Sequence, residues 1–151
     1  MERALVVLDD GDSESPLLRE AGELAAGVDA ELVLLALLST EDVESDLETL
    51  EAIANVEHTE YSEGTVRKSA AKAADSLAKD VFEGLDVNHT SVVSVSDDNR
   101  SAAILETANE YDCDHVFISG RKRSPTGKAV FGDTTQDVLL TFDGPVTVEL
   151  R

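Results

Sequence analysis

Residues 4–8, with the sequence ALVVL, form an unbroken apolar run that is closed by Asp9, Asp10 and Gly11. A run of this length without polar alternation is typical of a strand that is buried on both faces of a sheet. Residues 32–38, LVLLALL, repeat the pattern. Between the two runs, apolar residues recur at helical spacing at Leu17, Leu18, Ala21, Leu24 and Ala25. A strand, a helix and a second strand in this order predict a parallel βαβ unit.

The rest of the chain continues this alternation and carries no linker-like stretch. Apolar, β-branched runs predict strands at residues 90–95, 115–119 and 145–150. Helical spacing predicts helices over residues 65–83, after the capping residues 97–99, and over 134–140. We therefore expect one α/β domain, residues 1–151, with a parallel sheet and helices on both of its faces. Residues 40–64 have the weakest pattern, so a lid and an additional contact surface both stay open for them.

The charge balance is strongly acidic. The chain has 32 Asp and Glu residues against 12 Lys and Arg, a formal net charge of −20. Such a surface repels nucleic acid, so we expect no nucleic-acid partner. The acidic residues are spread along the chain, which favours a surface adapted to concentrated salt, where the screening length falls to about 3 Å. An ordinary acidic protein is the alternative.

Several function classes find no support in the sequence. The single cysteine, Cys113, precedes a predicted strand, which favours a small core residue over a reactive thiol. The three histidines lack the spacing of zinc ligands, and no residue resembles a nucleophile beside its base. There is no signal peptide and no stretch long enough to span a membrane, so we expect a soluble, cytoplasmic protein without a membrane partner.

In open parallel sheets, ligands bind beyond the carboxyl ends of the strands, where the strand order reverses. The segments at this edge are residues 9–13, 37–40, 96–99 and 120–134. Asp9 could accept a hydrogen bond from a base or ribose, or could cap the turn that follows it. For Asp97 and Asp98, capping of the next helix is favoured over binding of a cation or ribose.

The last of these segments is basic. Arg121, Lys122, Arg123 and Lys128 are four of the 12 basic residues and lie within eight positions. A loop of this kind between a strand and a helix can hold an anion on its backbone amides, which favours a phosphate or nucleotide cradle over a solvated crossover. It is not a Walker A loop, because six residues rather than four separate its first two glycines.

Four stretches, in this order and spacing, resemble the universal stress protein family over essentially the whole chain. They are the opening strand with the helix that ends in GELA (22–25), the strand at 31–38, ILETA (104–108) with CDHVFISG (113–120), and the glycine loop with GPVTV (144–148). The resemblance is to single-domain proteins of the haloarchaeal type. It implies a five-stranded parallel sheet in the order 3-2-1-4-5 and a homodimer that pairs through the last strand, Pro145 to Leu150.

Some members of this family bind ATP, and the resemblance implies where ATP with magnesium would lie. Adenine would lie near Asp9 and Leu37, and the phosphates near Gly120, Gly132 and Asp133. The other candidate residues of the loop are Arg121, Arg123, Gly127, Lys128 and Thr134. The family pattern is Gly-x2-Gly-x9-Gly-Ser/Thr. Here the loop is one residue short, lacks the second glycine, and has Asp133 in place of the Ser or Thr.

Both departures weaken the expected phosphate site. A carboxylate at Asp133 repels a phosphate by an amount on the order of several kcal/mol at short range. The basic residues offset part of this repulsion, and Thr134 can supply a shifted hydroxyl. The resemblance implies a non-catalytic stress-response or signalling protein that dimerises and holds a nucleotide. The alternatives are a nucleotide-free interaction module and, least favoured, a slow ATPase that uses Asp10 or Asp98 to hold magnesium.

Overall fold

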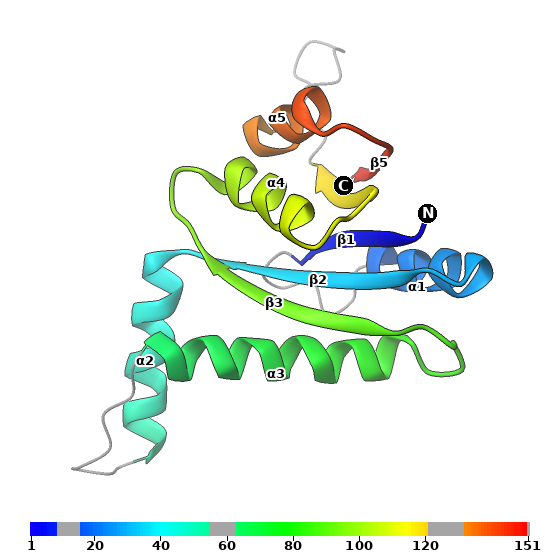
Figure 1. Ribbon diagram of the computed structural model, residues 1–151. Coiled ribbons are helices and arrows are strands. Elements are labelled where there is room, and N and C mark those ends of the chain that lie inside the picture. Colours follow the sequence, from blue (N-terminus) through cyan, green and yellow to red (C-terminus); the bar gives the residue numbers. More distant parts are fainter. Residues whose placement is uncertain (9–15, 55–62, 121–131, 151) are drawn as a thin grey trace.

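A computed structural model of the chain describes residues 1–8, 16–54, 63–120 and 132–150. Five parallel strands form one sheet in the order β3-β2-β1-β4-β5 (Figure 1). They are β1 (Arg3–Leu8), β2 (Glu31–Leu38), β3 (His89–Val95), β4 (His115–Gly120) and β5 (Val146–Leu150). The predicted fold class and strand order are therefore confirmed.

Five helices accompany the sheet within the described residues. They are α1 (Pro16–Val28), α2 (Thr40–Ala54), α3 (Glu63–Val81), α4 (Arg100–Glu110) and α5 (Asp133–Thr141). One buried cluster joins the sheet to α1 and to the end of α3, and another joins it to α4 and α5. The helices therefore lie on both faces, as the alternating pattern predicts, with α4 and α5 together on one side (Figure 1).

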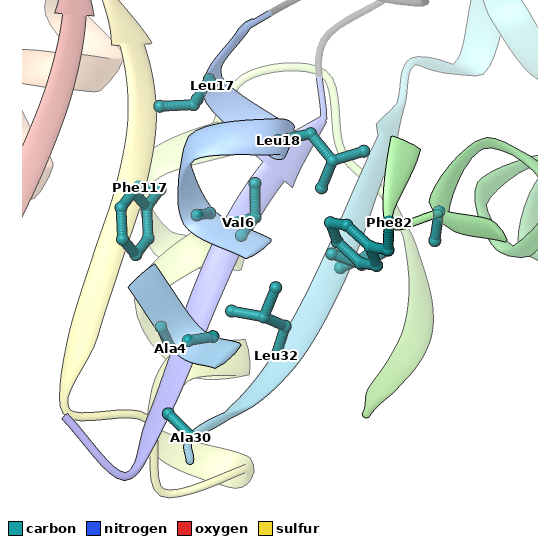
Figure 2. Packing of buried hydrophobic residues seen from close by; sticks show 12 residues of the cluster. Ala4, Val6, Leu17, Leu18, Ala30, Leu32, Phe82 and Phe117 are labelled. Carbon is teal, nitrogen blue, oxygen red and sulfur yellow. The ribbon is translucent and has the colours of Figure 1, made fainter. Parts of the chain in front are cut away.

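The central strand shows why its apolar run does not alternate. Ala4 and Val6 belong to the cluster under α1, whereas Leu5 and Val7 belong to the cluster under α4 and α5. All four side chains are buried. Figure 2 shows the first cluster, with Val6 lying beneath α1 and near Leu18 and Phe82. A strand covered on both faces needs apolar residues at every position.

Helix α1 packs closely against the chain that follows α3. A Cβ atom added at Gly22 would lie 2.6 Å from ring atoms of Phe82. Phe82 is itself buried against the same cluster. Gly22 therefore permits this contact because it has no side chain.

Helix α2 occupies most of the segment whose role the sequence leaves open. Val43 of α2 packs with Leu38 at the end of β2 and with Val66 of α3 in a third buried cluster. Figure 1 shows α2 at the carboxyl end of β2, beside the start of α3. Residues 40–54 thus form a helix that packs on α3, and residues 55–62 lie outside the described residues.

Candidate functional site

The central strand pairs over a shorter length than its neighbours at the carboxyl edge of the sheet. The last pair between β1 and β2 is Leu8 with Ala36, whereas β2 and β3 stay paired up to Leu38 and Val95. On the other side, the last pair between β1 and β4 is Val6 with Phe117, and β4 stays paired with β5 to Gly120. Pairing on both sides therefore extends beyond the end of β1, at the switch point where ligands of such sheets bind.

Helix α5 begins beside this edge. Thr135, in its first turn, is 5% exposed, and its Oγ1 donates a hydrogen bond of 3.1 Å to the carbonyl oxygen of Ser119 near the end of β4. The N-cap residue is Gly132, with an extended backbone (φ −60°, ψ 157°) and no side chain to cap the helix. The amide groups of this first turn therefore lack a side-chain cap and can receive an anion.

A buried hydroxyl lies next to this junction. Ser119 Oγ is inaccessible to solvent and finds no hydrogen-bond partner among the described residues. Leaving a buried hydroxyl without a partner costs on the order of 1–3 kcal/mol. Such a group calls for a structural or functional explanation, and a bound water or ligand group is one.

The third part of the edge joins β3 to α2. The carboxylate of Asp97 accepts hydrogen bonds from the amide and the hydroxyl of Thr40, at 2.8 and 2.5 Å. These two bonds lower the pKa of Asp97. The interpretation of Asp97 as a cap of the next helix is thus corrected, because its carboxylate instead binds Thr40, the first residue of α2. The N-cap residue of α4 is Asn99, whose side chain makes no capping bond.

The structure describes half of the residues predicted for the site. Gly120, Gly132, Asp133 and Thr134 lie where β4 ends and α5 begins, with Asp133 exposed. Leu37 lies near the end of β2, but its side chain is 2% exposed and packs in the core under α4. The remaining predicted site residues lie outside the described residues: Asp9, Arg121, Arg123, Gly127 and Lys128.

Two features of this edge were not found by sequence reasoning. Thr135 fixes α5 on β4, and its only signal was a threonine three residues after a glycine at a helix start. The bond between Asp97 and Thr40 joins residues 57 positions apart, so no local pattern could show it.

Within the described residues, no three His, Cys, Asp or Glu side chains are grouped to hold a metal ion. No helix in the described part is long and apolar enough to cross a membrane.

The chain also matches a known protein family. The family model for the Universal stress protein family (Usp) matches residues 1–148. The chain belongs to this family. The resemblance stated from the sequence is therefore confirmed, and the match covers nearly the whole chain of this universal stress protein.

Solved structures share the fold. A universal stress protein from Archaeoglobus fulgidus is 24% identical, with a TM-score of 0.65 and 98% of each chain covered. A universal stress protein in complex with cAMP is 17% identical, with a TM-score of 0.64, covering 99% of this chain and 96% of the other. A universal stress protein from Archaeoglobus fulgidus in complex with dAMP is 17% identical, with a TM-score of 0.60, covering 98% of this chain and 97% of the other. Comparison with curated proteins gives no match.

Proposed function

We propose that this universal stress protein binds an adenine nucleotide at the carboxyl edge of its sheet, beyond β1, and holds it without chemical conversion. The observation that carries the proposal is the start of α5. Its first turn has no side-chain cap, and Thr135 fixes it to β4 where the pairing of β1 has already ended. The related proteins solved with cAMP and dAMP support an adenine nucleotide as the ligand.

The charge of Asp133 affects how many phosphates a bound nucleotide can carry at this edge. The exposed carboxylate of Asp133 lies in the first turn of α5, where it disfavours a second and third phosphate. We expect a single phosphate to bind at the α5 amides more readily than a free triphosphate. ATP is compatible when magnesium accompanies it, because a carboxylate oxygen is a ligand that Mg²⁺ accepts.

Equilibrium dialysis of AMP, cAMP and ATP with magnesium, in concentrated KCl, tests the proposal. A Cβ added at Gly132 meets no atom within 4 Å, and its φ of −60° suits alanine, so Gly132→Ala should fold normally. We expect this variant to lower affinity about tenfold, equal to about 1.4 kcal/mol, because the methyl group obstructs the phosphate. Gly27→Ala, whose Cβ also meets nothing, is the matched control. Equal binding by both variants would contradict the proposal.

A nucleotide-free interaction module is the second candidate function, and the exposed Asp133 is the observation that favours it. Asp133→Ser distinguishes the two functions. If the α5 start holds phosphate, this variant gains affinity for ATP more than for AMP. If neither the wild type nor this variant binds a nucleotide, the interaction module is supported. Magnesium-dependent phosphate release would instead support the slow ATPase.

We also propose a homodimer that forms through the outer edge of β5. Within the described chain, β5 pairs with β4 on one side only. Leu150 of β5 is 49% exposed, and Leu140 of α5, the helix that precedes β5, is 78% exposed. Sedimentation of the wild type in KCl should give a dimer, and Leu140→Lys should weaken it. A monomer at all concentrations would refute this assembly.

The acidic composition supports a further proposal about the setting of the protein. We propose that the chain works in a cytoplasm rich in salt, because 32 acidic residues against 12 basic ones repel one another unless ions screen them. Ion pairs such as Arg3–Glu31, Arg19–Glu23 and His89–Asp75 engage single acidic residues, but 12 basic residues cannot pair with all 32 acidic ones.

A further inference from the structure

A groove lies between α4 and α5 at the amino edge of the sheet, opposite the edge discussed above. Its volume is about 510 Å³, within the range of small-molecule pockets. Leu105 and Ala108 of α4, Cys113 after it, and Phe142 after α5 give the groove an apolar wall. Ala108, Cys113 and Phe142 belong to or pack against the core beneath these two helices, and Leu105 is half-buried on α4, so the fold holds this wall in place.

The rim of the groove is negatively charged. Asp112, Asp114 and Asp143 all line it and are exposed. Helices α4 and α5 run antiparallel to the strands they follow, so both end here and both direct the negative ends of their dipoles toward this edge. Neither helix has a basic residue in its last turn.

Arg3, which bonds to the residue before Asp112, is already engaged. Arg3 donates a bond of 2.7 Å to the carbonyl oxygen of Tyr111 and forms an ion pair of 3.0 Å with Glu31. One oxygen of Asp114 accepts a bond of 2.8 Å from the amide of Glu2, which leaves its charge uncompensated by a basic side chain. The groove thus joins an apolar wall to three carboxylates.

We propose that this groove binds a small organic cation, with an ammonium or guanidinium group carried on an apolar body. The apolar body packs on Leu105 and Phe142, and the cationic group is held by the rim of Asp112, Asp114 and Asp143. The ring of Phe142 adds an attraction for the cation when the two come within about 6 Å. This site is separate from the proposed nucleotide edge and does not depend on it.

Helix α1 offers a matched control for Asp112. Asp112 follows α4 in a left-handed conformation (φ 52°), and the amide of Cys113 donates to the carbonyl of Ala108. Asp29 follows α1 in the same conformation (φ 59°), and the amide of Ala30 donates to Ala25 in the same way. Asparagine tolerates this conformation, so Asp112→Asn and Asp29→Asn each remove one charge with little effect on the backbone.

The test is an NMR titration of the ¹⁵N-labelled protein with 2-phenylethylammonium, at the lowest KCl concentration that keeps the chain folded. We expect saturable shifts confined to residues 105–114 and 141–143. The uncharged 2-phenylethanol, with the same apolar body, should bind several-fold more weakly. Asp112→Asn and Asp143→Asn should each lower the affinity for the ammonium probe by about two- to fivefold, as for partly exposed ion pairs. Asp29→Asn should leave it unchanged.

Each other outcome overturns the proposal in a recognisable way. Equal binding of the alcohol shows an apolar groove that does not select a cation. An equal loss in Asp29→Asn shows a response to the net charge of the surface. Shifts spread over the whole chain, or no saturation, show that there is no site in the groove.

Discussion

At the scale of single residues, the buried hydroxyl of Thr135 does most to position the candidate nucleotide edge. Its bond to the carbonyl of Ser119 fixes the first turn of α5 at the end of β4. Thr135→Val keeps the shape and removes the donor, so we expect a loss of about 1 kcal/mol in the free energy of unfolding, measured with urea in KCl. Thr141→Val, on the exposed end of α5, is the control and should change stability by less than about 0.5 kcal/mol. Equal losses would mean that the bond from Thr135 to Ser119 makes no specific contribution to stability.

His115 gives the fold a dependence on pH. It lies on β4, where burial lowers its pKa below 6.5 despite the opposing charge of Asp114. The ring stacks on Phe117 with centroids 4.6 Å apart and contacts Thr147 Oγ1 at 2.8 Å. Because folding favours the neutral ring, its contribution is present above about pH 6.5 and is lost as the pH falls through that value.

The variant His115→Gln tests this dependence, since glutamine does not titrate. Urea unfolding between about pH 8 and pH 5 should show the wild type losing stability relative to the variant below about pH 6.5. The comparison cancels the contributions of the other titrating groups, because the two proteins share them. Parallel pH profiles for the two proteins would show that His115 titrates alike in the folded and unfolded states.

Single residues also show which features of the site could be predicted from the sequence and which could not. The departure at Asp133 was visible in the sequence, and the structure places this carboxylate, exposed, in the first turn of α5. By contrast, the bonds between Asp97 and Thr40 depend on β2 and β3 ending side by side, which only the tertiary structure determines. The prediction that Cys113 is a small core residue is partly confirmed. The residue is half-buried, and burial raises its pKa to about 11, so its thiol stays protonated near neutral pH.

At the scale of elements, the contact between α1 and the end of α3 makes a sharp prediction. In Gly22→Ala the new methyl carbon would lie 2.6 Å from the ring of Phe82, so we expect a loss of about 1–3 kcal/mol. In Gly27→Ala, on the same helix, the new carbon meets nothing, so we expect a gain of about 0.5–1 kcal/mol. Urea unfolding of both variants checks the pair. A gain in both would mean that Phe82 moves aside at no cost.

The elements themselves were predictable because their apolar residues are periodic. The strands at 4–8 and 32–38 were recognised because both of their faces are buried. The phase of α3 was less well determined by its sequence, since Ala74 and Ala78 are buried while the neighbouring Ala73 is exposed. Alanine-rich stretches give a weak periodic signal, so only the packing against β3 and α1 fixes which face turns inward.

At the scale of the whole molecule, the net charge of −20 should make stability depend on salt. Thermal unfolding followed by circular dichroism should give a Tm that rises as KCl increases from about 0.1 M to about 2 M, because screening weakens the mutual repulsion. Replacing the exposed Glu44, Glu48 and Glu106 by glutamine should reduce this rise. A Tm that is insensitive to KCl would contradict adaptation to salt.

The central claim concerns the carboxyl edge of the sheet, and a nucleotide titration of the wild type tests it most directly. Thermal unfolding is followed in concentrated KCl with increasing AMP, and separately with ATP and magnesium. A ligand that binds only the folded chain stabilises it by about 2.7 kcal/mol at a hundred times its Kd, so the account predicts a concentration-dependent rise in Tm with either nucleotide. No rise at millimolar nucleotide would contradict it and would leave the fold without the ligand we assign to it.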